Sequence, residues 1–265
     1  MKTDKIFEIL WEQYADQNPS VRKIHQLFEK EGETVVNDHI AIRTVNDPRV
    51  GIDVLETPFL AGGYKEAGSY DFPEKKLFAK HFEMDGYPRV FISELLLEEF
   101  SDEFQETIKT LIDNVSPEVL APDRLIVSGA VFGTISHVLY EKIREESEYA
   151  AWVSVYGYRA NHFTVSVNHL NRLDTIQKVN SFLKKNGFPL NSAGGEVKGS
   201  PAELLEQSST LADRVTMEFS EGSFEIPSCY YEFARRYPDA QGKLFSGFIA
   251  GSADKIFEST NFRRK

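Results

Sequence analysis

Residues 37–45 read NDHIAIRTV, and the organisation of the whole chain follows from this stretch. Its alternating pattern and its β-branched residues predict a β-strand. Because successive side chains of a strand point to opposite faces, His39, Ala41 and Arg43 share one face. An unpaired buried guanidinium is very costly, so this face is expected to line something polar. His39 and Arg43 lie roughly 13 Å apart along a strand, which fits a metal at one end and a carboxylate-ended small molecule at the other.

Composition narrows the class of protein. The 265 residues, 41% hydrophobic and 27% charged, are typical of a soluble globular protein with an ample core. The net charge of -11 argues against a nucleic-acid partner, which needs a concentrated basic surface. The sequence contains no apolar run of membrane-spanning length and no signal-peptide pattern, so we expect no membrane association and a cytoplasmic location. The single cysteine, Cys229, excludes an internal disulfide and indicates a reducing compartment.

The chain divides into consecutive parts that we expect to form one metalloenzyme domain, residues 1–265. These parts are N-terminal helices at 1–36, a first strand-rich module at 37–93, a helical insertion at 94–150, and a second module with a C-terminal segment at 151–265. Helical spacing of apolar residues within the first part, broken at Pro19, predicts two helices with Ser20 as the N-cap of the second.

The two modules are predicted to share one layout, a strand, a helix ended by glycine, and further strands. The first is expected to contain a strand at 37–45, a helix at 50–60 and strands at 64–72, 75–83 and 87–92. The second is expected to contain a strand at 159–167, a helix at 174–186 and strands around 196–199, 212–219 and 224–233. This layout predicts an α+β fold in which two βαβββ modules form a curved sheet around a metal, with N-terminal and inserted helices.

The candidate metal ligands are His39 and His162, which occupy equivalent positions of the two modules, and Glu232 on a late strand. A mononuclear Fe(II) oxygenase site needs two such imidazoles and a carboxylate, with open positions for substrate and dioxygen. Each residue also has a simpler interpretation, a hydrogen-bonded core histidine or a solvated edge carboxylate. His81 is the best substitute ligand. The other histidines, which we expect to have surface or packing roles, are His25, His137 and His169.

Substrate-binding candidates are fewer. The guanidinium of Arg43 can bind a substrate carboxylate through two parallel hydrogen bonds. A structural ion pair with an acidic residue of the chain is an equally good interpretation. The polar run QSST at 207–210 contains Gln207 and Ser209, which could donate hydrogen bonds to a substrate. The simpler interpretation of this run is a turn or a cap.

Several longer motifs carry a family resemblance. They are DHIAIRT at 38–44, PRVFISEL at 88–95, NHFT at 161–164, QSST at 207–210, CYYEFA at 229–234 and IFEST at 256–260. In this order they resemble the motifs of the 2-oxoadipate dioxygenase/decarboxylase family, a variant of the vicinal oxygen chelate fold that is similar to hydroxymandelate synthase and 4-hydroxyphenylpyruvate dioxygenase. The resemblance implies two modules like those of vicinal oxygen chelate proteins.

The resemblance also implies chemistry. It implies that His39, His162 and Glu232 hold Fe(II), although Zn, Ni or Mn could occupy the site in a purified sample, and that Arg43 binds the distal carboxylate of a 2-oxo acid. The reaction, a step of lysine catabolism in this family, converts 2-oxoadipate and O2 into 2-hydroxyglutarate and CO2. This chain is much shorter than the characterised lysine-catabolic members, so its physiological substrate stays open. The oligomeric state and a supporting role for Glu258 also stay open.

Two other classes of function remain. The same ligands could hold a metal that acts as a Lewis acid in a lyase, isomerase or hydrolase reaction without oxygen. A protein that only binds a small dicarboxylate is the other alternative. Oxygen consumption separates the first alternative from the oxygenase, and binding without turnover would favour the second.

Overall fold

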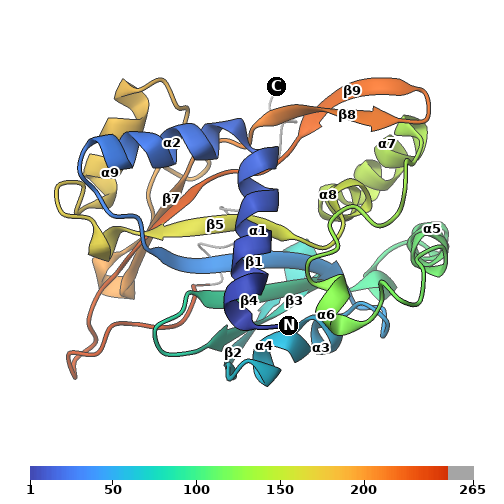
Figure 1. Ribbon diagram of the computed structural model, residues 1–265, viewed down its shortest axis with the longest axis horizontal. Coiled ribbons are helices and arrows are strands. Elements are labelled where there is room, and N and C mark those ends of the chain that lie inside the picture. Colours follow the sequence, from blue (N-terminus) through green and yellow to red (C-terminus); the bar gives the residue numbers. More distant parts are fainter. Residues whose placement is uncertain (250–265) are drawn as a thin grey trace. The chain divides into compact units, whose positions relative to one another are not determined.

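The computed structural model (Figure 1) describes residues 1–249. The chain divides into two compact units. Unit 1 comprises Met1–Tyr14, Ala41–Asn161 and Arg214–Ile226. Unit 2 comprises Ala15–Ile40, His162–Asp213 and the segment that begins at Pro227. Each unit combines a sheet with helices, so the predicted α+β class is confirmed. The grouping of all residues into one domain stays a prediction.

The sheet of unit 1 has the strand order β2-β3-β4-β1. Its strands are β1 (Asn37–Val45, of which residues 41–45 belong to this unit), β2 (Lys65–Phe72), β3 (Leu77–Glu83) and β4 (Arg89–Leu95). β2 pairs antiparallel with β3, and β3 pairs antiparallel with β4. A separate hairpin consists of β8 (Arg214–Phe219) and β9 (Gly222–Pro227).

Helices make up much of the rest of unit 1. They are α1 (Thr3–Gln17, mostly in this unit), α3 (Ile52–Leu55), α4 (Thr57–Ala61), α5 (Asp102–Asp113), α6 (Pro122–Leu125), α7 (His137–Glu146) and α8 (Glu148–Tyr156), with short 3-10 helices at Pro73–Lys75 and Leu97–Glu99. Ser101, Ser136 and Ser147 cap α5, α7 and α8 with their side chains, which explains where these helices begin. α5 to α8 fall in the segment from which the sequence predicts helices, although α8 continues beyond residue 150.

The sheet of unit 2 has the strand order β5-β10-β7-β6. Its strands are β5 (Ala160–Ser166, mostly in this unit), β6 (Lys198–Ser200), β7 (Leu205–Ser209) and β10 (Glu232–Arg236). β10 runs parallel to β5 and antiparallel to β7, which in turn is antiparallel to β6. The unit also contains α2 (Pro19–Lys30), α9 (Ile176–Lys185) and 3-10 helices at Val167–His169 and Pro201–Glu203.

Aromatic packing joins α2 and α9 to the sheet of unit 2. Phe28 of α2 stacks on Phe182 of α9 with ring centroids 5.6 Å apart, and it meets Phe233 of β10 edge-on at 5.9 Å. The two helices therefore lie side by side (Figure 1), and Phe28 also joins α2 to β10. α9 ends at Lys185, and Gly187 follows in the left-handed conformation with φ of 85°, as the sequence predicts.

The internal repeat is confirmed by the strand orders. Each module runs strand, helix, three strands, namely β1, α3–α4, β2, β3, β4 in the first and β5, α9, β6, β7, β10 in the second. Within both modules the last strand lies beside the first, followed by the third and the second. The β8–β9 hairpin is an addition that interrupts the second module in sequence but belongs to unit 1.

The structure corrects the predicted placement of two elements. The single strand expected at 224–233 is wrong, because β9 ends at Pro227, which lacks a backbone N–H, and β10 begins only at Glu232. The turn interpretation of residues 207–210 is also wrong, since residues 207–209 belong to β7, which pairs with β10 on one side and β6 on the other.

The prediction of Ser20 as an N-cap is wrong as well. α2 begins at Pro19, so Asn18 occupies the N-cap position. The side-chain oxygen of Asn18 accepts hydrogen bonds from the Ser228 hydroxyl at 2.6 Å and the Cys229 N–H at 2.9 Å, and does not cap the helix. Proline suits the first helical position because its missing N–H would have no partner there.

Candidate metal centre

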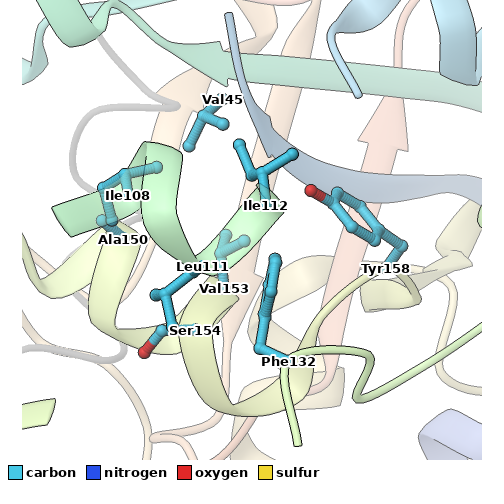
Figure 2. Close-up of a pocket in the computed structure, with 9 residues that line it drawn as sticks. All are labelled: Val45, Ile108, Leu111, Ile112, Phe132, Ala150, Val153, Ser154 and Tyr158. Carbon is cyan, nitrogen blue, oxygen red and sulfur yellow. The ribbon is translucent and has the colours of Figure 1, made fainter. Parts of the chain in front are cut away.

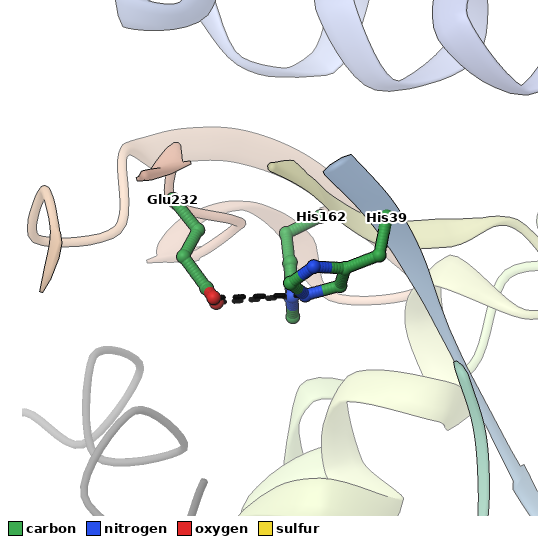
Figure 3. A group of neighbouring side chains, drawn as sticks. All are labelled: His39, His162 and Glu232. Atoms are coloured by element: carbon green, nitrogen blue, oxygen red, sulfur yellow. Dashed lines mark ion pairs between the residues drawn. The ribbon is translucent and has the colours of Figure 1, made fainter. Parts of the chain in front are cut away.

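Three buried side chains of unit 2 converge at one point, and they are the predicted ligands. His39 lies on β1, His162 on β5 and Glu232 at the start of β10 (Figure 3). One ligand atom from each residue lies within 4.8 Å of the other two. The register explains the convergence, because Glu232 stands beside Thr164 on the parallel strand β5, and Thr164 shares a face with His162 two residues earlier.

The carboxylate of Glu232 faces both imidazoles. Its Oε2 lies 3.2 Å from His162 Nε2, and its Oε1 lies 3.6 Å from His39 Nε2. Burial by itself raises the pKa of the Glu232 carboxyl, but His162, His39 and the amide of Gln207 outweigh burial and hold the pKa below its usual range. Glu232 is therefore a carboxylate at neutral pH, as a metal ligand must be.

Neighbouring groups fix the orientation of His39 and Glu232. Asp38 Oδ1 lies 2.8 Å from His39 Nδ1, which favours a proton on Nδ1 and a free electron pair on Nε2. Gln207 Nε2 donates a hydrogen bond of 2.6 Å to Glu232 Oε1. Thr164 Oγ1 lies 3.1 Å from His39 Nε2. Such outer partners are typical of metal sites, where they hold the ligating atoms in place.

Asp38 itself is tied to Arg236, the last residue of β10. Arg236 Nε donates to Asp38 Oδ2 at 2.8 Å, and Arg236 Nη2 donates to Asp38 Oδ1 at 2.9 Å. Burial raises the pKa of the Asp38 carboxyl, but the Arg236 guanidinium and the hydrogen bond with His39 lower it well below its usual range. The buried carboxylate therefore carries its charge with a matched partner.

The donor set fits a divalent metal. Two imidazoles and one carboxylate form the set that non-haem Fe(II) oxygenases use, with other coordination positions left for substrate. Ligands that bind one ion at about 2.0–2.2 Å in adjacent positions lie about 3 Å apart, close to the two separations that involve Glu232. The side chains of all three residues are at most 5% exposed, so the site also lies away from bulk water.

Arg43 lies on β1 in unit 1, where two aromatic rings of α8 hold its guanidinium. Its Cζ is 4.9 Å from the ring centroid of Tyr149 and 5.4 Å from that of Trp152. The Tyr149 hydroxyl donates to the Ser93 carbonyl at 2.7 Å and accepts the Thr44 N–H at 3.1 Å, so this ring is itself fixed. The two rings therefore restrict the orientation of the buried guanidinium of Arg43.

The other site candidates have different surroundings. Gln207 donates its amide to Glu232, and Ser209 stands opposite Glu232 in the β7–β10 register. Substrate binding by these two residues stays a prediction. His81 is buried in unit 1 with Nδ1 3.0 Å from the Tyr70 hydroxyl and Nε2 3.2 Å from a Glu83 oxygen, so the structure gives it polar neighbours other than the metal-site residues. Glu258 lies outside the described residues.

Sequence reasoning missed Asp38 and Arg236. The position of Asp38 next to His39 was the one available signal, whereas its partner Arg236 lies 198 residues away in the chain. No spacing rule connects residues so far apart. Thr164 belongs to the NHFT motif, but only the strand register places it beside Glu232.

A small apolar cavity in unit 1 offers no second candidate site. Its volume is about 10 Å³, which is about the space of one water molecule. Figure 2 shows the side chains that line it. The lining residues are Val45, Ile108, Leu111, Ile112, Phe132, Ala150, Val153, Ser154 and Tyr158. None of them is a histidine, a carboxylate or a cation. Among the helices of residues 1–249, none has the length and apolar character needed to cross a bilayer.

Comparison with known proteins adds independent information. A sequence model of the 2-oxoadipate dioxygenase/decarboxylase family matches residues 4–126 and 130–243. The chain is 38% identical over 277 residues to the chloroplastic/amyloplastic 2-oxoadipate dioxygenase/decarboxylase of Oryza sativa subsp. japonica, a match that covers 94% of this chain and 76% of the rice protein.

Solved structures agree in fold. Hydroxyglutarate synthase from Oryza sativa in complex with 2-oxoadipate is 36% identical with a TM-score of 0.91, covering 97% of this chain and 91% of that one. A Shewanella frigidimarina protein, provisionally named a hydrolase, is 52% identical with a TM-score of 0.88, covering 93% and 97%. A glyoxalase superfamily protein from Ralstonia eutropha, 22% identical with a TM-score of 0.77 over 93% and 85% of the two chains, shares the fold. The predicted relation to vicinal oxygen chelate proteins is therefore confirmed at the level of fold.

Proposed function

The chain belongs to the 2-oxoadipate dioxygenase/decarboxylase family and is an enzyme of that kind, and we propose that it binds Fe(II) through His39, His162 and Glu232. The substrate in this proposal is a 2-oxo dicarboxylic acid such as 2-oxoadipate, which becomes a 2-hydroxy acid with one carbon fewer. The observation that carries the proposal is the buried convergence of two imidazoles and a carboxylate from three residues of unit 2.

The reaction balances without a further reductant. One molecule of 2-oxoadipate and one of O2 contain the atoms of one 2-hydroxyglutarate and one CO2. Fe(II), when bound, supplies the redox chemistry that O2 requires and the open coordination positions where the two reactants meet. The protein's own contribution is to hold three ligands, leave the other positions open and keep bulk water away.

Each supporting residue has a defined task in this proposal. Asp38 accepts the Nδ1 proton of His39, so the lone pair of Nε2 is available to the metal. The amide of Gln207 holds Oε1 of Glu232, which limits the rotation of that carboxylate. Both interactions fix ligand atoms before the metal arrives, which reduces the entropy lost on binding.

Arg43 has the task of selecting the substrate. Its guanidinium can form two parallel hydrogen bonds with the far carboxylate of a dicarboxylic acid, and the rings of Tyr149 and Trp152 fix the plane of this fork. Arg43 and His39 lie on the same strand, four residues apart. We expect the length of the preferred acid to depend on Arg43.

Oxygen uptake tests the proposal directly. Protein reconstituted anaerobically with Fe(II) is mixed with 2-oxoadipate and with shorter and longer 2-oxo acids, and dissolved O2, CO2 and the hydroxy acid are measured. We expect equal amounts of O2 consumed and CO2 released, and no uptake by His39→Ala or by protein without Fe(II). Bound iron without uptake for any acid would refute the oxygenase chemistry.

One observation favours a second function, the provisional hydrolase name of the Shewanella frigidimarina protein. In this alternative the same three residues hold Zn, Ni or Mn, and the substrate is cleaved or rearranged without O2. Turnover that continues under strictly anaerobic conditions would favour it. Cytoplasmic location and a role in lysine catabolism stay predictions, and the name of the rice relative refers to plastids.

A further inference from the structure

The side of His39 that faces away from Glu232 contacts a buried ion pair. His39 Nδ1 lies 2.8 Å from Asp38 Oδ1, and Arg236 donates one hydrogen bond to each oxygen of the Asp38 carboxylate. The side chains of Asp38 and Arg236 are 3% and 2% exposed. A bidentate pair between two planar groups sets the plane of the carboxylate. That plane in turn sets the direction in which His39 presents its ring.

Arg236 also holds a segment near the end of the described chain. Its Nη1 donates to the carbonyl oxygens of Phe245 at 3.1 Å and Gly247 at 2.7 Å. Its Cζ lies 5.2 Å from the centroid of the Phe248 ring. We call residues 245–248 the C-terminal strap. One guanidinium therefore binds both the strap and the carboxylate that orients His39.

The strap also touches His39 directly. The Phe248 ring meets the His39 ring edge-on, with centroids 4.8 Å apart and an interplanar angle of 88°. His39 thus has Asp38 at Nδ1, Phe248 against its ring and Glu232 near Nε2. A ring confined on these sides has little freedom to rotate.

A purely structural ion pair would not need this arrangement. Buried pairs add little net stability over apolar residues of the same size, because desolvation offsets their attraction. Arg236 instead donates hydrogen bonds to three groups at once, the Asp38 carboxylate and two strap carbonyls. Through Asp38 it also acts on His39, a candidate metal ligand. Lysine could not match this geometry, since its single ammonium lacks the planar fork.

We propose that Arg236 is a positioning residue of the metal centre, which orients His39 through Asp38 and docks the C-terminal strap against the same ring. This inference rests on the metal site of the proposed function. It follows that metal binding and strap docking stabilise each other, because both favour one orientation of His39. The ligand whose binding is coupled to strap docking is a divalent cation, and this coupling does not depend on which reaction the metal-bound site catalyses.

Cobalt binding to the full-length, metal-free protein tests the proposal without reference to turnover. The affinity for Co²⁺ is measured from its visible spectrum, and amide hydrogen exchange of the strap is followed with and without Co²⁺. In the wild type we expect metal to slow strap exchange. In Arg236→Lys we expect affinity to fall about 10- to 100-fold and the slowing to disappear.

A second variant and a control separate positioning from simple loss of stability. Asp38→Asn keeps an oxygen for His39 but places an NH₂ group against the guanidinium, so it is expected to weaken Co²⁺ binding in the same range. Glu33→Gln is the control, because its buried carboxylate accepts backbone hydrogen bonds from residues 171–173 in the same unit. It should lower the melting temperature and leave Co²⁺ affinity within about twofold.

The outcomes distinguish this inference from the proposed function. Co²⁺ affinity within twofold of the wild type in both Arg236→Lys and Asp38→Asn would overturn the positioning role and leave the metal site intact. An equal loss of affinity in Glu33→Gln would also overturn it, because the effect would then follow stability. Failure of the wild type to bind Co²⁺ would overturn the metal site itself, and this inference with it.

Discussion

Replacing Arg43 by methionine should remove recognition of the far carboxylate of a 2-oxo dicarboxylic acid. Methionine keeps a long side chain against the rings of Tyr149 and Trp152, which lie 4.9 and 5.4 Å from the guanidinium carbon, and removes only the charge and the donors. The variant should therefore fold, with a loss of about 1 kcal/mol from the two cation–π contacts.

The expected loss of activity follows from the two hydrogen bonds that a guanidinium makes with a carboxylate. Each bond to a charged group contributes about 1.5–2 kcal/mol, so about 3–4 kcal/mol of transition-state binding is removed. This corresponds to a decrease of about 10²- to 10³-fold in kcat/KM for 2-oxoadipate. For 2-oxohexanoate, which has no far carboxylate, kcat/KM should change less than about threefold.

Initial rates of O2 uptake over a range of concentrations of both acids give the two ratios, and iron content is measured on the same samples. Arg43→Lys is the matched variant, because it keeps the charge without the planar fork and should fall between the wild type and Arg43→Met. An unchanged ratio of the two kcat/KM values would refute the role of Arg43 in substrate selection. A collapse of iron content would instead assign Arg43 to structure.

Two further predictions concern unit 2. Gln207→Leu removes the donor to Glu232 Oε1, so Co²⁺ affinity measured by titration should fall about tenfold, and unchanged affinity would contradict the supporting role of the amide. The pKa of Glu33 is lowered, since the backbone N–H groups of Asn171, Leu173 and Arg172 together outweigh burial, which alone raises it. The carboxylate therefore contributes stability above its unfolded pKa of about 4.3 and loses it as pH falls through the lower folded pKa. In urea titrations the free energy of unfolding of Glu33→Gln should lie about 2 kcal/mol below the wild type at pH 7, with the gap closing below about pH 4, and a gap that is constant with pH would contradict this account.

The repeat was accessible from sequence because it rests on local patterns. His39 and His162 each sit in a strand of β-branched residues that precedes a helix and a glycine, and this layout alone predicted two matching modules. The structure gives both modules the same strand order. Glu232 on a late strand was the candidate for the anionic third ligand that such a site needs, and the family motifs then implied the same three residues.

Other features depend on long-range pairing that no local pattern reveals. β7 reads LEQSS, a polar stretch, yet it forms a strand because its backbone pairs with β10 on one side and β6 on the other, and all five of its residues are buried. Strand propensity is a weak guide in such a case, since burial between two strands overrides it. The pair formed by Asp38 and Arg236 likewise joins residues that are 198 positions apart.

The two faces of β10 make different contacts, so the number of residues in the preceding segment decides which side chain lies on which face. Glu232 points to the two imidazoles, while Phe233, the next residue, packs edge-on against Phe28 of α2. Because side chains alternate along a strand, deleting one residue from 228–231 would shift the parity of β10 and exchange these two positions. A phenyl ring would then face the histidines and a carboxylate would enter the aromatic core. Insertions and deletions in this short connection should therefore be far less tolerated, during evolution or in engineering, than substitutions of its individual residues.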